Sequence, residues 1–267
     1  MAGLKGKNIL ITGAASGIGR LMSIYFAGEG ANIALVDINE EALKEVEAEV
    51  KGIGVTARFY VCDISNREDI EKTASKSKED FGRIHILVNN AGIVTGKYTY
   101  EAEYEGLKKI IDINLLGLIW MTRQFLPDMM EADDGRIVNI SSLMGLFPVP
   151  RMSDYVATKF GVIGYSDTLR LEMKKFNKKG VGVTIVCPGG FDSGMFEGFE
   201  SPWICPLLSQ EVVAGKIVKA VKKKKPYLKI PFIVKVIPFA RGLPPSIIDR
   251  VSVLLGLNRA MDHFTGR

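Results

Sequence analysis

The fold of this chain is most directly predicted from residues 8–19, which read Asn8-Ile-Leu-Ile-Thr-Gly-Ala-Ala-Ser-Gly-Ile-Gly19. The uncharged run that ends at Thr12 predicts a buried strand, and a helix is expected to follow it through about Gly28. Glycine lets the backbone turn tightly and approach a pyrophosphate, and the start of a helix offers free N–H groups and a positive dipole end. Glycine-rich loops also make ordinary turns. The position between a first strand and a first helix nevertheless favours a nucleotide-binding loop, here with the spacing GxxxGxG instead of GxGxxG.

The same alternation of strand and helix continues along the chain. The strands are apolar throughout, which is typical of strands covered by helices on both faces. Repeated strand–helix units require a parallel sheet with right-handed crossovers, and its ligands bind beyond the carboxyl ends of the strands. The sequence therefore predicts an α/β protein with a doubly wound, Rossmann-type parallel sheet of about seven strands. The other expected strands are 32–37, 55–61, 84–89, 137–141 and 181–187, and the other expected helices are 40–51, 67–81, one or two over 101–131, 154–176 and one near 210–225.

The composition is that of a globular protein. A chain of 267 residues with 47% hydrophobic content can bury a core, and no repeat or flexible linker divides it, so we expect one domain over residues 1–267. Cys62, Cys187 and Cys205 lie far apart, which argues against a disulfide framework or a metal site and favours the cytoplasm. The first residues lack the apolar stretch of a signal peptide, and no apolar run reaches the roughly 18 residues of a membrane span.

The charge is unevenly distributed. The net charge is +5, but residues 216–267 carry twelve Lys and Arg against two acidic residues, whereas residues 1–215 carry 23 basic and 28 acidic residues. The basic character therefore belongs to the C-terminal part. Because this part has no recognisable nucleic-acid-binding module, we expect no nucleic-acid partner.

Tyr155 and Lys159 form the most informative polar pair. They stand four residues apart, in the sequence Tyr-Val-Ala-Thr-Lys, and so lie on one face of a helix. A phenol has an unperturbed pKa of about 10, and a neighbouring ammonium favours its phenolate form. Such a tyrosine can exchange a proton with an alcohol or a carbonyl compound.

The spacing alone proves little, because Tyr104 and Lys108 share it. Context separates the two pairs. Ser142 stands thirteen residues before Tyr155, at the end of a predicted strand, whereas Ala91 stands thirteen residues before Tyr104 and has no hydroxyl group.

Asp37 ends the second predicted strand. A carboxylate there can accept hydrogen bonds from an adenosine ribose and would repel a 2′-phosphate. Residues 38–41 contain no Arg or Lys, and Ala14 and Ala15 are not basic either, so the sequence favours NAD over NADP. A simpler alternative is that Asp37 only caps the next helix. Asp63 follows the third strand and could meet the adenine.

Several motifs come in a characteristic order, and with them the chain resembles the short-chain dehydrogenase/reductase family. The resemblance covers about residues 5–215. The motifs are TGAASGIG at 12–19, NNAG at 89–92, Asn114, IVNISS at 137–142, YVATK at 155–159 and CPGG at 187–190.

The resemblance implies a catalytic tetrad. Ser142 would hold the substrate oxygen, Tyr155 would be the acid/base, Lys159 would lower the tyrosine pKa and bind the nicotinamide ribose, and Asn114 would position a water. Ser141 is the alternative serine. The family usually has threonine where this chain has Ser193. The implied cofactor-binding residues are Thr12, Gly13, Ser16, Gly17, Ile18, Gly19, Asp37, Asp63, Ile64, Asn90, Ala91, Gly92, Tyr155, Lys159, Pro188, Gly189, Phe191 and Ser193.

The residues expected on the substrate side are strongly apolar. Residues 190–208 are expected to form a lid over the substrate. An aromatic- and Met-rich pocket with few charges suits a lipophilic alcohol or ketone. The alternative is that half of these side chains only pack the core. The expected pocket residues are Met144, Phe147, Val149, Met195, Phe196 and Trp203.

The basic and apolar extension at 222–267 resembles the retinol and 17-beta-hydroxysteroid dehydrogenase branch of the family, whose members tend to sit on membranes or lipid droplets. Cationic and apolar residues interleaved in this way suit peripheral contact with an anionic lipid surface. Two alternatives are that the apolar residues cover the substrate pocket or form a subunit interface.

These observations predict an NAD-dependent oxidoreductase that interconverts a lipophilic alcohol (a steroid, a retinoid or a long-chain alcohol) and its ketone or aldehyde. An NADPH-dependent carbonyl or 3-oxoacyl reductase is the second reading, and Asp37 argues against it. A cofactor-binding lipid-surface protein without activity is the third, and the intact tetrad argues against that. Family habit implies a homodimer or homotetramer.

Overall fold

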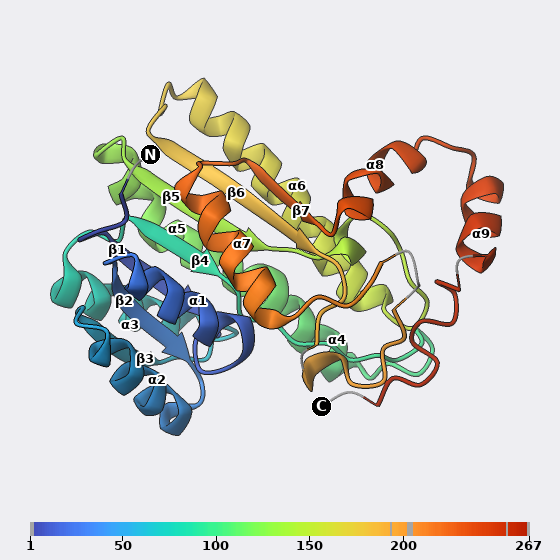
Figure 1. Cartoon of the computed structure of the whole chain (residues 1–267), viewed down its shortest axis with the longest axis horizontal. Coiled ribbons are helices and arrows are strands. Elements are labelled where there is room, and N and C mark those ends of the chain that lie inside the picture. The colour runs from blue at the N-terminus through green and yellow to red at the C-terminus, as the bar shows by residue number, and fades with distance from the viewer. Residues whose placement is uncertain (1–2, 193, 202–204, 255, 266–267) are drawn as a thin grey trace.

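A computed structural model describes residues 3–192, 194–201, 205–254 and 256–265. Its centre is a seven-stranded parallel sheet in the order β3-β2-β1-β4-β5-β6-β7 (Figure 1). The predicted doubly wound Rossmann-type fold is confirmed. The strands are β1 (Asn8–Thr12), β2 (Asn32–Asp37), β3 (Ala57–Val61), β4 (Ile86–Asn89), β5 (Gly135–Ile140), β6 (Val181–Pro188) and β7 (Tyr227–Ile230).

Helices cover both faces of the sheet, because each strand sends alternate apolar side chains to either side. On one face Ile9 and Ile11 of β1 join a core with the first helices and α7, and on the other face Leu10 joins a core with α3, α5 and α6. The first face carries α1 (Gly17–Gly28), α2 (Glu40–Gly52) and α7 (Gln210–Lys222), and the second carries α3 (Arg67–Phe81), α5 (Leu118–Glu131) and α6 (Ser153–Lys175).

The predicted helical region 101–131 is divided. It consists of α4 (Tyr104–Ile111), a π-helical turn over Asp112–Gly117, and α5. Wide π turns of this kind are frequent at functional sites, and this one holds Asn114.

The C-terminal part begins with β7, which pairs with β6 and completes the sheet. After β7, the short helix α8 (Ile237–Ala240) and the helix α9 (Pro245–Leu254) project from the body of the molecule, and the chain then returns to the side of α4 (Figure 1). In the part of the chain that the structure describes, no helix is long and apolar enough to cross a bilayer.

All strands of the sheet are parallel, so their carboxyl ends share one edge. This edge gathers Thr12, Asp37, Asn89 and Pro188, and the residue pair Ser141–Ser142 follows β5 there. Polar groups from segments far apart in the sequence are thereby concentrated in one place.

Candidate active site

The glycine-rich loop after β1 is shaped by close backbone approach. A Cβ at Gly19 would overlap the carbonyl oxygen of Gly13, so only glycine fits there. Gly13 has φ +66°, a left-handed conformation that side chains rarely adopt. The Asn90 amide donates to the carbonyls of Thr12 (3.0 Å) and Gly13 (3.1 Å), which fixes the loop to the end of β4.

The start of α1 fits an anionic ligand. Ser16 is the N-cap residue, but its side chain accepts no capping hydrogen bond in the described chain. Ser16 and Gly17 are exposed, whereas Ile18 turns into the core. The first N–H groups of the helix therefore stay available, together with the positive end of the helix dipole. A pyrophosphate fits this loop.

Asp37 turns toward this loop. Its carboxylate accepts hydrogen bonds from the backbone N–H groups of Ala15 (3.1 Å) and Asn39 (3.1 Å). It is not the cap of α2, because Asn39 holds that position and accepts from Ala42 N–H. Asp37 thus links the glycine-rich loop to the edge of β2, where a ribose would lie.

Most other cofactor residues predicted from the sequence also lie along this edge. Asp63 accepts from the Ser65 backbone N–H (2.8 Å) and hydroxyl (2.7 Å) through one carboxylate oxygen. Gly189 donates its N–H to the Ile230 carbonyl at the end of β7. Phe191 follows and pairs with Leu208. Ser193 lies outside the described residues, and Ile64, Ala91, Gly92 and Pro188 lie at or just after the carboxyl ends of β3, β4 and β6.

Tyr155 and Lys159 lie on the first turns of α6, as their spacing predicts. The Lys159 ammonium stands 5.4 Å from the centre of the Tyr155 ring, and both side chains are buried. Lys159 Nζ donates to the Ile140 carbonyl at the end of β5 (3.0 Å). Tyr104 differs, because it is 87% exposed and is therefore not part of a buried tyrosine–lysine pair.

The two serines after β5 have different surroundings. The Ser141 hydroxyl donates to the Lys159 carbonyl (2.9 Å), so it ties β5 to α6. The Ser142 hydroxyl accepts from Met144 N–H (3.1 Å) and also lies close enough to lower the pKa of Tyr155. Ser142 is thus the serine next to the phenol, as the thirteen-residue gap indicates.

Burial dominates the ionisation of this pair. It raises the pKa of Tyr155 above its usual value, because the phenolate loses water, and Ser142 opposes this. Burial lowers the pKa of Lys159 to about 8, because the ammonium loses water as well. A proton on Lys159 is therefore held weakly enough to respond near neutral pH.

The lowered pKa of Lys159 predicts how the free energy of unfolding changes with pH. Between about pH 8 and pH 10.5 the unfolded chain binds more protons at Lys159 than the folded chain, so the free energy of unfolding rises with pH there. From about pH 7 to about pH 10, the wild type should gain roughly 2–3 kcal/mol relative to Lys159→Met. Denaturant unfolding of the cofactor-free protein measures it. A flat difference for Lys159→Met would contradict the prediction.

Asn114 holds its place through backbone contacts. Its side chain accepts from Ile93 N–H (2.8 Å) and donates to the Ile93 carbonyl (2.9 Å). A Cβ on Gly92 would lie 3.1 Å from Asn114 Oδ1 and 3.6 Å from Lys159 Nζ, so these groups converge beside the end of β4. The π-helical turn thus brings Asn114 next to the Tyr155–Lys159 pair.

An apolar cluster surrounds Tyr155. The ring of Phe196 meets the ring of Tyr155 edge to face, with 5.8 Å between centres, and Phe199 packs behind it. Of the predicted pocket residues, Met144, Val149 and Phe196 belong to this cluster. It also contains Val94, Ile110, Met152, Ala260, Met261 and Phe264.

Two of the predicted pocket residues lie elsewhere. Phe147 is buried outside the Tyr155 cluster, and Met195 is 37% exposed. In the tight turn Gly194–Phe196, successive side chains point about 120° apart, so Met195 and Phe196 point in different directions. Trp203 lies outside the described residues.

The C-terminal segment packs into this cluster, which favours the alternative that apolar residues of the extension cover the substrate pocket. Met261 and Phe264 are separated from Tyr155 by about a hundred residues yet pack in its cluster. Arg151 holds the segment, because its guanidinium donates to the carbonyls of Met261 (2.8 Å) and Asp262 (3.1 Å). The only sequence signal is the apolar pattern near the end of the chain, which does not reveal its destination.

Such a fold, with a dinucleotide-type loop and a Ser–Tyr–Lys group at the same edge, defines an oxidoreductase that uses a nicotinamide cofactor. The chain belongs to the short-chain dehydrogenase/reductase family, since the family model described as "short chain dehydrogenase" matches residues 7–202. It is an NAD(P)-dependent oxidoreductase that acts on CH–OH groups.

Relatives with known names agree with this assignment. The chain is 36% identical to "Short-chain dehydrogenase/reductase family 16C member 6" of Bos taurus, over 98% of this chain and 84% of that protein. It is 37% identical to "Epidermal retinol dehydrogenase 2" of Homo sapiens, over 97% and 85%. The match to "Retinol dehydrogenase 10" of Rattus norvegicus is 32% over 97% and 85%. These relatives belong to the retinol-dehydrogenase-like branch.

Solved structures are similar too. A short-chain dehydrogenase/reductase from Burkholderia phymatum in complex with NAD superposes with a TM-score of 0.82 and 25% identity, covering 97% of this chain and 98% of that one. A metagenomic short-chain oxidoreductase in complex with NADP gives 0.71 and 28%, covering 82% and 91%. Both cofactors thus occur among the structural relatives.

Proposed function

We propose that this protein uses NAD to interconvert a lipophilic alcohol and its ketone or aldehyde, with Tyr155 as general acid/base. The observation that carries the proposal is the placement of the Tyr155 phenol. It lies beside the Lys159 ammonium and the Ser142 hydroxyl, at the edge where the glycine-rich loop opens, and it faces an apolar cluster.

Each polar residue has one task in this proposal. Ser142 donates a hydrogen bond to the substrate oxygen and holds it next to the phenol. Tyr155 takes the hydroxyl proton during oxidation and returns a proton during reduction. The Lys159 ammonium stabilises the phenolate, and Asn114 positions the Ile93 segment and a water beside Lys159. Bound NAD supplies the hydride acceptor.

The lipophilic substrate class is supported by the apolar cluster around Tyr155. Phe196, Met144 and Val149 pack around Tyr155, together with Met261 and Phe264 from the C-terminal segment. Contact with these side chains favours substrate binding by roughly 25 cal/mol per Å² of apolar substrate surface removed from water. Retinoids, steroids and long-chain alcohols fit this description, and the named retinol dehydrogenases among the relatives favour it.

An alcohol panel tests the proposal. NADH formation would be measured for retinol, for steroid alcohols and for straight-chain alcohols of increasing length. We expect kcat/KM to rise with apolar surface and to be lowest for short or charged alcohols. Activity only on polar alcohols, or only on 3-oxoacyl substrates with NADPH, would sink the proposal. A wild type that binds NAD but oxidises nothing in the panel would favour a cofactor-binding protein without activity.

Asp37 is proposed to set the preference for NAD. Asp37→Ala should weaken NAD binding at least about tenfold. It should also shift the relative affinity toward NADP, because a carboxylate that repels the 2′-phosphate is removed. Dissociation constants for both cofactors measure it. Glu41→Gln removes a charge from the first turn of α2 and should change neither value appreciably. If the wild type already binds NADP ten times more tightly, the preference for NAD is wrong.

We further propose that the C-terminal part contacts anionic lipid surfaces. Phe232, Phe239 and Leu254 are 74%, 82% and 83% exposed, and Lys229, Lys235, Arg241 and Arg250 lie among them. Apolar side chains can enter the headgroup region while the cations meet lipid phosphates.

Vesicle sedimentation tests this contact. Binding to phosphatidylserine vesicles should weaken with salt and should be reduced severalfold in Phe239→Ser, whereas Leu171→Ser, at an exposed apolar residue on α6, should bind like the wild type. No partitioning at low salt would rule the contact out. A homodimer or homotetramer stays a prediction.

A further inference from the structure

Arg136 occupies an unusual position in β5. Side chains at 136, 138 and 140 point to the same face of the sheet. Val138 and Ile140 pack in the core beneath α1 and α7. Arg136 begins this row at the amino end of the strand, on the edge opposite the active site, and it carries a guanidinium where the row is otherwise aliphatic.

The guanidinium is buried without a counter-charge. Arg136 is only 9% exposed, and among the described residues it makes no ion pair. Its side-chain hydrogen bond there runs from Nη1 to the Thr184 hydroxyl (3.0 Å), which itself donates to the Lys225 carbonyl (2.8 Å). A Cβ at Gly182 would lie 2.7 Å from Arg136 Cζ, so the neighbouring strand leaves room for the guanidinium.

Such an arrangement is costly unless another group completes it. A guanidinium has five N–H donors and stays charged in proteins, although burial lowers the pKa of Arg136. Buried charges are normally paired or fully hydrogen-bonded. One neutral hydroxyl acceptor does not balance the charge, whereas an anion would.

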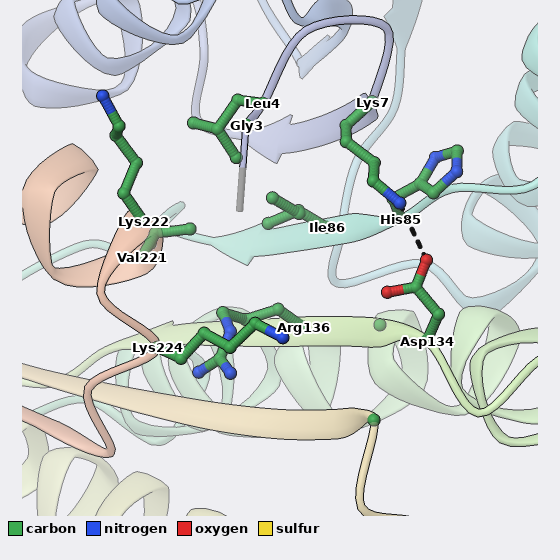
Figure 2. Close-up of a pocket in the computed structure, with 12 residues that line it drawn as sticks. Gly3, Leu4, Lys7, His85, Ile86, Asp134, Arg136, Val221, Lys222 and Lys224 are labelled. Atoms are coloured by element: carbon green, nitrogen blue, oxygen red, sulfur yellow. Dashed lines mark hydrogen bonds and ion pairs between the residues drawn. The ribbon is translucent and has the colours of Figure 1, made fainter. Parts of the chain in front are cut away.

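A cavity of about 110 Å³ lies in front of Arg136 (Figure 2). It is also lined by Lys7, Asp134, His85, Lys222 and Lys224. Asp134 is not free to serve Arg136, because Lys7 (2.8 Å) and Arg83 (3.1 Å) already pair with it.

The remaining cations differ in their partners. Lys222 pairs with Glu29 (2.7 Å). His85 adds no charge at neutral pH, because burial and the nearby Lys7 lower its pKa and its Nδ1 accepts from Asn8 N–H (3.1 Å). Lys224 makes no ion pair in the described chain. Arg136 and Lys224 are therefore the unneutralised cations of the cavity.

The backbone presents Lys224 in an unfavourable conformation. It has φ +51°, at the position after the end of α7 where helices usually place glycine. The Lys224 and Lys225 N–H groups donate to the Val221 and Ala220 carbonyls, so the geometry is that of a glycine-type helix end. A lysine in this left-handed conformation costs conformational energy, which is consistent with a need for its charge.

We propose that this cavity binds a phosphate-type oxyanion between Arg136 and Lys224. An oxyanion offers the several acceptors that a guanidinium fork needs, and two cations match a dianion. The site lies at the amino-terminal edge of the sheet, so it is separate from the cofactor loop and from Tyr155. The oxyanion is either a free phosphate ion or the phosphate group of a small molecule.

Calorimetric titration with inorganic phosphate tests the proposal. It is done at constant ionic strength, with a saturating nicotinamide dinucleotide that occupies the α1 loop. We expect one saturable site with Kd of about 1 mM or tighter. Lys224→Gln should weaken binding about tenfold, and Lys223→Gln, the neighbouring lysine that does not line the cavity, should change it less than twofold. No saturable binding, or equal losses in both variants, would overturn the proposal.

Two further measurements complete the test. Glycerol 3-phosphate in place of inorganic phosphate distinguishes the sources: tighter binding of the ester assigns an organic phosphate, and weaker binding assigns the free ion. Arg136→Met should abolish phosphate binding and should melt at the same or a higher temperature than the wild type in phosphate-free buffer, because an uncompensated buried charge is removed. A folded Arg136→Met variant that still binds phosphate like the wild type would contradict the site.

Discussion

Replacing Tyr155 with phenylalanine is expected to lower kcat/KM for alcohol oxidation by about 10³-fold, because general acid/base groups typically contribute 10²–10⁴. Phenylalanine keeps the ring in the apolar cluster and the edge-to-face contact with Phe196, so the fold should be retained. The Kd for NAD should stay within about threefold, since the pyrophosphate fits the glycine-rich loop, and Tyr155 is not part of that loop. Steady-state kinetics and cofactor titration measure both quantities.

The chain supplies a matched control for this substitution. Tyr104 has a lysine at the same spacing, but it is exposed on α4. Tyr104→Phe should retain wild-type kinetics. If Tyr155→Phe kept more than about a tenth of the activity, or if Tyr104→Phe lost as much, the assignment of the acid/base would be wrong.

Gly19→Ala is expected to weaken NAD binding by more than about 10²-fold and to lower the melting temperature by several degrees. The added methyl group would overlap the Gly13 carbonyl oxygen and would lie 2.8 Å from the Asn90 amide nitrogen. The backbone of the loop must therefore shift, and a shift of about 1 Å can remove the N–H groups from their ligand. Cofactor titration and thermal unfolding detect the two effects.

Gly28→Ala is the control on the same helix. A Cβ at Gly28 meets no atom within 4 Å, and alanine favours helix by roughly 0.5–1 kcal/mol over glycine. This variant should bind NAD like the wild type and should be equally or slightly more stable. Wild-type affinity in Gly19→Ala would show that the loop does not hold the pyrophosphate.

Much of the fold was predictable because its signals are local. The strands β1, β2 and β6 can be predicted from their continuous apolar runs alone, and the loop after β1 can be predicted from its glycines. The pair Tyr155 and Lys159 needs one helical turn. Each of these features depends on residues within a few positions of each other, so a single sequence carries them.

The rest depends on contacts between distant residues. Met261 and Phe264 reach the Tyr155 cluster only because Arg151 binds the carbonyls of that segment. Nothing near Met261 in the sequence announces this partner. The same holds for Met195, which a tight turn directs to solvent although its neighbour Phe196 faces the phenol.

The π-helical turn is an intermediate case. Asn114 is recognisable in the sequence as a polar residue inside an apolar stretch, but the extra residue in its turn is not. Its amide replaces a backbone partner for Ile93, and that pairing exists only once β4 and α4 are in place. The importance of Asn114 was predictable from the sequence, but the π-helical geometry that positions it was not.

Transfer of a labelled hydride tests the central claim most directly. A lipophilic alcohol that carries deuterium on its carbinol carbon would be incubated with NAD and the wild-type protein, and the cofactor would be recovered for mass spectrometry. The account predicts reduced NAD with one deuterium, and none above background with Tyr155→Phe. Product formation with an unlabelled reduced cofactor, or deuterium-labelled reduced NAD formed by Tyr155→Phe at the wild-type rate, would contradict it.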